Sequence, residues 1–348
     1  MLLKGPLKFA SQGSHRERFS RISSDTLPPL GSPVSTHILS HRVDAQTALE
    51  QRSWQAIESK KFGWRNDYIS MMKTYKDFGL FEEGKAELLA SANTSESTTV
   101  SLTRAEMLAH APTFEDVLNA LVSCPELGAK IKQGFTRLFP VFGLNSMSYF
   151  EAMGNALRLH RDAGTLSIED GEATNFDERE PLAFSQDSDY LGRSTSYHPQ
   201  RYEAGYGVST AEMMKASKFP GWEVFLLQDF VDRSEENSLS GARDDIDAST
   251  PTQFLARLQL AQAKGKNALE QGMTSQTALA LFLDHIVKTG GVVPNQRIAC
   301  IGSYIPDADK VPVLTWSDIS KQVLMTTIDP RISAQGSDCD MPTVVKVL

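Results

Sequence analysis

Cysteine is scarce in this sequence, and its spacing excludes two kinds of site. The 348 residues include three cysteines, Cys124, Cys300 and Cys339, which lie far apart. They form no Cys-x-x-Cys pair and have no neighbouring pair of histidines, so the sequence indicates neither a disulfide framework nor a zinc site. A reducing compartment and no bound metal are the simplest interpretation.

Long apolar runs and the common catalytic motifs are also missing. The longest apolar run in a predicted helix, Ala278 to Leu283, is far shorter than the roughly 20 residues needed to cross a bilayer. No phosphate-binding glycine loop and no Gly-x-Ser-x-Gly segment occurs in the chain. We therefore expect no membrane span and no cofactor.

Acidic residues outnumber basic ones after the first 42 residues. The net charge is −8 at pH 7, and because residues 1–42 carry +4, the remainder carries −12. An acidic body repels the phosphates of nucleic acids, and no local basic patch offsets that repulsion. We expect no nucleic-acid partner.

Residues 1–42 are basic and rich in serine and proline, with too few apolar residues to form a core. This composition predicts a flexible tail. It also fits a targeting segment, either an organellar transit peptide or a bacterial export signal, whereas a classical secretory signal would need an apolar core. We therefore expect a cytoplasmic protein or one exported through this segment, and not a classical secretory protein.

Residues 43–161 are predicted to form a helical domain. The helical pattern starts at Asp44, which is placed to cap the first turn. Two segments, Thr103 to Glu106 and Thr113 to Asp116, have the spacing of a capping box, in which a hydroxyl and a carboxylate satisfy the free amides of a new helix.

A further helix is predicted to begin at Pro125, because proline is tolerated in the first turn. Apolar residues then recur at helical spacing, which predicts that one face of this helix is buried as far as Phe139. The apolar positions are Leu127, Ile131, Phe135, Leu138 and Phe139.

Residues 162–248 are predicted to be an acidic, tyrosine-rich loop region with short elements, among them a strand at Trp222 to Leu227. Nine acidic residues fall between positions 162 and 189 against one arginine. Half of the eight tyrosines follow, at Tyr190, Tyr197, Tyr202 and Tyr206. Tyrosines are common at protein interfaces, so this loop and Trp316 are the predicted binding residues, with folding of the loop onto its own domain as the alternative.

Residues 249–348 are predicted to form an α+β module. Thr250 and Pro251 open one helix, which Gly265 ends, and Thr274 caps a second that runs to Lys288. Four short β-rich runs follow, at residues 297–301, 311–316, 322–328 and 343–347. Helices packed on a small antiparallel sheet are the expected arrangement, and the whole chain is expected to be α+β.

Four segments of this module resemble, in order, the C-terminal part of an uncharacterised bacterial family: GMTS at 272–275, ALAL at 278–281, CIGS at 300–303 and VPVLTWS at 311–317. Members of that family have a helix that begins at a Leu-Thr cap, then a Gly-Ser-Arg turn and a Val-Pro-Ala-Leu-Trp strand. Here Tyr304 stands where the family has arginine, and the tryptophan-rich ending is missing. The resemblance implies a bacterial origin and a fold, because the family has no established activity.

Candidate catalytic residues are few. Asp284 and His285 precede a glycine turn and Ser303 ends a predicted strand, which suggests a Ser/His/Asp hydrolase. Neighbouring helical residues point about 100° apart, however, so Asp284 is badly placed to orient His285. A structural role on the rim of a buried helix is the favoured interpretation of both.

The clustered tyrosines and the missing catalytic spacing favour a protein-interaction or regulatory protein, for instance an exported bacterial effector. Two alternatives stay open. One is an enzyme of unrecognised class with its site in the C-terminal module, near Asp284, His285, Arg297, Ser303 and Trp316. The other is a structural subunit of a larger assembly.

Overall fold

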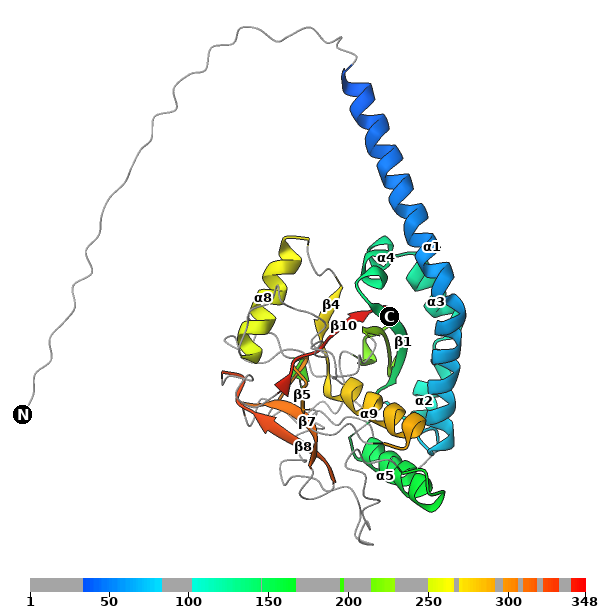
Figure 1. Cartoon of the computed structure of the whole chain (residues 1–348), viewed down its shortest axis with the longest axis vertical. Coiled ribbons are helices and arrows are strands. Elements are labelled where there is room, and N and C mark those ends of the chain that lie inside the picture. Colours follow the sequence, from blue (N-terminus) through cyan, green and yellow to red (C-terminus); the bar gives the residue numbers. More distant parts are fainter. Residues whose placement is uncertain are drawn as a thin grey trace, which may run out of the picture. The chain divides into compact units, whose positions relative to one another are not determined.

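The computed structural model confirms the α+β class (Figure 1). It describes residues 34–82, 102–144, 146–166, 195–196, 214–228, 250–265, 269–291, 297–305, 309–317, 322–331 and 339–348. By its internal contacts the chain divides into two units, Met1–Thr47 and Ala48–Leu348. The first unit contributes the start of helix α1, and the sheets, the core and the candidate site belong to the second.

One four-stranded antiparallel sheet has the strand order β1, β3, β10, β4. Its strands are Phe135–Phe142, Trp222–Gln228, Thr343–Lys346 and Glu270–Gly272. Phe139 of β1 lies opposite Phe225 of β3. Both strands are buried along most of their length, as the largely apolar sequence of the predicted strand at Trp222 indicates.

A second four-stranded sheet has the order β8, β7, β5, β9. Its strands are Gln322–Ile328, Val311–Ser317, Arg297–Ala299 and Cys339–Asp340. The pairs of β7 with β8 and with β5 are antiparallel, whereas β9 pairs with β5 in parallel. Strands β2 (Thr195–Ser196) and β6 (Ser303–Tyr304) form a separate antiparallel pair. The strands predicted in the C-terminal module are thus confirmed, with small differences at their ends.

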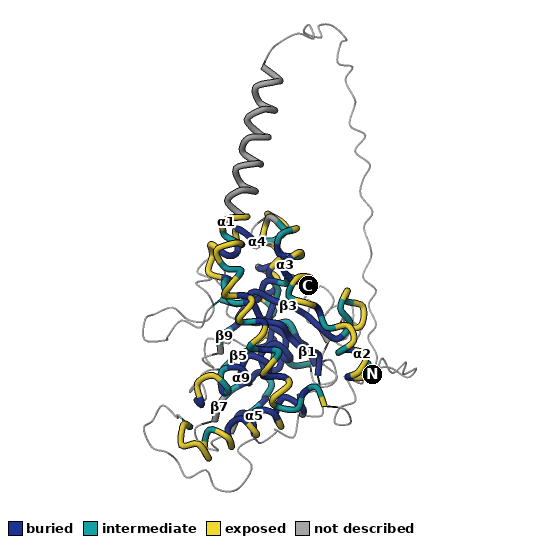
Figure 2. The backbone as a smooth tube through the Cα atoms, turned by 90° about the vertical axis from the view of Figure 1, so that its right-hand side faces the viewer, coloured by how far each residue is buried: buried dark blue, intermediate teal, exposed yellow. Residues whose placement is uncertain are grey.

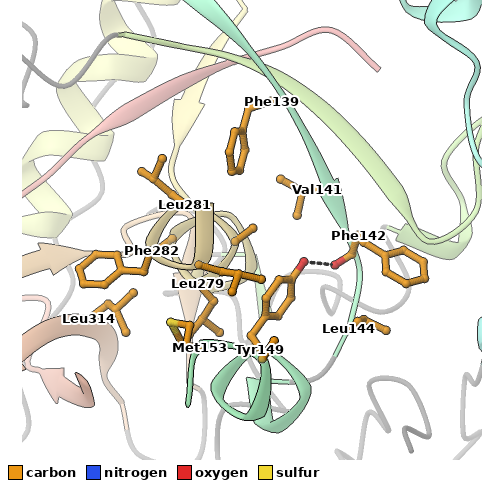
Figure 3. Packing of buried hydrophobic residues seen from close by; sticks show 14 of the residues in the cluster. Phe139, Val141, Phe142, Leu144, Tyr149, Met153, Leu279, Leu281, Phe282 and Leu314 are labelled. Atoms are coloured by element: carbon orange, nitrogen blue, oxygen red, sulfur yellow. Dashed lines mark hydrogen bonds between the residues drawn. The ribbon is translucent and has the colours of Figure 1, made fainter. Parts of the chain in front are cut away.

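Helix α9 (Ser275–Thr289) packs between the two larger sheets and against helix α5 (Ser146–Asp162). Figure 3 shows Leu279, Leu281 and Phe282 of α9 among side chains of β1, α5 and β7. Residues 278–283 are all buried, which confirms burial on all sides.

Three further helices begin where their caps predict. Both capping boxes are formed, at the starts of α2 (Arg104–Ala109) and α3 (Phe114–Val122). The Thr250 side chain accepts a hydrogen bond from the Gln253 amide and caps α8 (Pro251–Ala263). These caps are confirmed because each depends on residues within four positions of one another.

Within the second unit, helix α1 (Val34–Asp77) buries one face between Ile57 and Tyr75. The indole of Trp64 donates a hydrogen bond to the Thr136 carbonyl at 2.8 Å, and the Tyr75 hydroxyl donates one to the Pro140 carbonyl at 2.8 Å. Figure 2 shows buried strands inside and exposed residues on the surrounding helices. Two aromatic side chains thus attach α1 to the backbone of β1.

The helix predicted from Pro125 to Phe139 is wrong in its second half. Helix α4 (Pro125–Lys132) ends before Gly134, whose φ of +94° does not continue a helix, and β1 begins at Phe135. Buried residues of the strand happen to continue the helical spacing of α4. Pairing with β3, which is distant in the sequence, decides in favour of the strand.

Two boundaries are also corrected. Helix α1 begins at Val34, not at Asp44, so it starts within the segment 1–42 that was predicted to be a tail. The compact unit Ala48–Leu348 does not divide near residues 161 and 249, because one sheet joins β1 and β3 to β4 and β10. Residues 1–33 lie outside the described part of the chain.

Candidate functional site

Asp284, the first predicted catalytic residue, is part of a buried ion-pair cluster. Its carboxylate is 1% exposed, accepts a hydrogen bond from the Arg137 guanidinium of β1, and lies 3.1 Å from the Lys288 ammonium of the same helix. These two cations compensate the charge that burial would otherwise make costly. The arrangement fixes α9 to β1.

His285 is the next residue of α9 and is half-buried. Burial lowers the pKa of His285 below its ordinary value of 6.5, and the Arg137 charge lowers it further, while Asp284 acts in the opposite direction. The imidazole therefore favours the neutral form near pH 7. A neutral imidazole suits a general base, but a base needs a nucleophile within hydrogen-bonding reach.

Ser303 lies at the opposite end of α9. Its hydroxyl is buried, accepts a hydrogen bond from the Ser275 amide at 3.0 Å and lies 3.3 Å from the Ser275 hydroxyl. Asp284 follows Ser275 by nine residues, about 13 Å along a helix. The structure therefore does not bring Ser303 together with Asp284 and His285, and Ser303 caps the first turn of α9 instead.

The predicted binding tyrosines, Tyr190, Tyr197, Tyr202 and Tyr206, lie outside the described residues. Trp316 lies in β7, where the structure describes the backbone alone. An interface at these residues stays a prediction.

A pocket of about 470 Å³ lies where the end of α1 meets α2 and α5. Its lining has mixed charge and consists of Asp77, Phe78, Gly79, Leu80, Glu82, Arg104, Ser148, Glu151, Asn155, Arg158, Leu159 and Asp162. In the described part of the chain, no three histidine, cysteine or acidic residues gather as a metal site would require. The charged residues of the lining are four acidic side chains and two arginines.

Arg104 is the most buried charge of that pocket, at 5% exposed. Its guanidinium donates to the carbonyls of Gly79 (3.3 Å) and Glu82 (2.7 Å) and to the Ser148 hydroxyl (3.1 Å). Burial lowers the pKa of Arg104, while the acidic residues Glu151 and Glu82 act against that shift. Arg104 therefore connects the segment that follows α1 with helix α5. Its terminal nitrogens are engaged in these structural hydrogen bonds.

The outer face of α1 carries three large apolar side chains that its own fold leaves exposed. Trp54 is 48%, Phe62 78% and Ile69 53% exposed. At 100° per residue these positions fall at 0°, about 80° and about 60° around the helix, within one arc. Buried Ile57, Trp64, Tyr68, Met71 and Tyr75 occupy a different arc, centred roughly 120° away on the same scale. We call Trp54, Phe62 and Ile69 the outer stripe.

Sequence reasoning missed the outer stripe, although its spacing was visible. The two apolar sets of α1 overlap in the sequence, so they can be separated only when the inner set is known to be buried. Trp64 and Tyr75 supply that information through their bonds to β1.

No known protein family, characterised protein or solved structure matches this chain. Among the described helices, none combines the length and apolarity that a membrane crossing requires. The geometry of the described residues must therefore carry any functional proposal.

Proposed function

We propose that this chain is a protein-interaction or regulatory protein that binds its partner through the outer stripe of α1. The main support is that Trp54, Phe62 and Ile69 are exposed on one arc of a helix whose other arc is buried. Large apolar side chains gathered on one surface mark interaction sites more often than scattered ones do. Tryptophan in particular is enriched among the residues that dominate binding energy.

The stripe is held on a rigid support. Trp64 and Tyr75 fix the inner arc of α1 to backbone carbonyls of β1, and Met71 is buried in the core between them. A preformed helix loses little conformational entropy on binding, which favours affinity. An amphipathic helix presented in this way fits an apolar groove or a second helix.

A photo-crosslinking amino acid in place of Phe62 tests this proposal in cells. We expect a discrete crosslinked product, which decreases when Trp54→Ala is added in the same chain. Leu260 of α8, 56% exposed and outside the stripe, is the matched control position. Equal crosslinking at positions 62 and 260, or no product at 62, would contradict a docking face on α1.

The enzyme alternative loses its main argument, since Ser303 caps α9 at the end away from Asp284 and His285. Export through residues 1–42 and a partner surface at Tyr190 to Tyr206 stay predictions. The double change Tyr197→Ala and Tyr202→Ala tests the latter, because it should weaken partner capture and leave thermal stability nearly unchanged.

A further inference from the structure

We infer that the partner of the outer stripe is a second copy of this chain, docked antiparallel along α1. This inference rests on the proposed function and adds the identity of the partner. It comes from the pattern of apolar and charged residues on the exposed arc of α1 between Trp54 and Ile69.

The arc is complementary to itself when one copy is reversed. A two-fold axis that passes between Lys61 and Phe62 places Trp54 of one chain opposite Ile69 of the other, because these positions are equally far from the axis. The symmetry repeats each contact, so the dimer has two Trp–Ile contacts. The two Phe62 side chains meet near the axis, where the stripe is most exposed.

The same axis places opposite charges together. Glu58 of one chain lies opposite Arg65 of the other, and both residues lie between Trp54 and Ile69 on the exposed arc. Among the described residues, Glu58 makes a distant contact with Lys61 at 3.6 Å, and its side chain is 55% exposed. A parallel dimer would instead place like charges against each other, which disfavours association. The charges thus select the antiparallel arrangement.

The size of the stripe sets the expected strength. Three partly exposed side chains on each copy bury a few hundred Å² of apolar surface, from the roughly 150–250 Å² that a large aromatic residue can bury. This is at the low end for specific protein interfaces. We expect a dimer that dissociates at roughly micromolar concentration.

Sedimentation velocity of the full chain from about 1 to 200 μM tests the inference, a range that brackets a micromolar dissociation constant. We expect a shift from monomer to dimer as the concentration rises. Phe62→Glu should keep the chain monomeric, whereas Leu260→Glu on α8 should leave the shift unchanged. Circular dichroism of each variant shows whether the fold is intact.

Charge reversal tests the register. Glu58→Arg alone and Arg65→Glu alone should each weaken the dimer by about tenfold, because each places like charges together across the axis. The double variant should recover the affinity. Failure to recover would overturn the antiparallel register.

A chain that stays monomeric at every concentration would overturn self-association. If the crosslink at position 62 then contains another protein, the proposed function stands with a different partner. If no crosslink forms either, both proposals are wrong.

Discussion

Two carboxylates, those of Asp284 and Glu270, are buried beside cations that lie 147 and 140 residues away in the sequence. Asp284 pairs with Arg137 and so joins α9 to β1, while Glu270 pairs with Lys130 and joins β4 to α4. Loss of one member of such a pair leaves the other charge buried without compensation. Single residues therefore carry a large share of the attachment between distant segments.

Asp284→Asn should lower the free energy of unfolding by about 3 kcal/mol, because Arg137 then keeps its charge in a largely buried position. Urea unfolding followed by circular dichroism measures the change. Asp77→Asn is the control, since the Lys73–Asp77 pair is exposed and should contribute little. Equal effects of the two substitutions would show that the buried pair has no special role.

His285 should give the protein a pH-dependent stability. Its pKa is below 6.5 in the folded protein, so the unfolded chain binds the proton first as the pH falls. The contribution of His285 to the free energy of unfolding is therefore complete above pH 6.5. It is lost as the pH falls from 6.5 toward the lower pKa that His285 has in the folded protein. Unfolding free energies between about pH 7.5 and 5.5 should decline less in His285→Gln than in the original chain.

His110→Gln, at an exposed position in the C-cap of α2, is the control for that experiment. It should leave the decline with pH as it is in the original chain. The opposite sign in the original chain, with stability rising as the pH falls through this range, would contradict burial as the cause.

The ion pairs also show why the candidate site could not be predicted from the sequence. Asp284 and His285 were catalytic candidates because they are adjacent polar residues beside a glycine turn, although a structural role was the favoured interpretation. Their physical role depends on Arg137, and nothing in the local sequence indicates that β1 passes beside α9. Ser303 likewise serves the amide of Ser275, whose distance from it is fixed only by the fold.

At the scale of elements, the features that depend on neighbouring residues could be predicted from the sequence. Those that depend on distant residues could not. The capping boxes at Thr103 and Thr113 were predicted correctly because hydroxyl, amide and carboxylate all lie within one turn. Strand β1 was missed because its apolar residues continue the helical spacing of α4. Its hydrogen bonds to β3 come from residues 222–228, which no local pattern relates to it.

Gly290 and Gly265 follow the last turns of α9 and α8, and both have a left-handed φ, of 67° and 73°. Their surroundings differ: an added methyl group at Gly290 would collide with the Thr165 carbonyl and the His160 ring, whereas Gly265 has open space. Gly265→Ala should therefore cost about 1 kcal/mol from backbone strain alone. Gly290→Ala should cost clearly more, and thermal unfolding of the two variants compares them.

Because Gly290 ends α9 beside the end of α5, its substitution also tests the contact between these helices. The extra cost should disappear if the chain after α5 is free to move away from Gly290. Equal melting temperatures for the two variants would mean that the close approach of Thr165 is not maintained in solution.

At the scale of the whole molecule, one cluster of buried residues draws on both of the predicted domains. Buried residues from α1, β1, β3, α9 and β7 belong to the same cluster, with Met71, Phe139, Phe225, Leu281 and Leu314 among them. The acidic region after residue 161 was predicted to be a loop region between two domains because of its composition. Composition shows which segments are polar. It does not show that β3 and β10, on either side of such segments, pair in one sheet.

The fragment 249–348 should therefore fail to fold alone, although its helices and strands were predicted well. In the intact sheet, β10 lies between β3 and β4, so removal of residues 1–248 exposes one edge of β10 and the apolar side of α9 that faces β1. We expect no cooperative thermal transition in circular dichroism and broad amide signals in NMR.

Co-expression of residues 1–248 with residues 249–348 is the complementary arm of that experiment. Because the pairing of β3 with β10 and the packing of β1 on α9 need no covalent link, the two pieces should copurify and recover a cooperative transition. Asp284→Asn in the second piece should weaken the complex, since Arg137 lies in the first. A fragment 249–348 that unfolds cooperatively alone would instead restore the two-domain description.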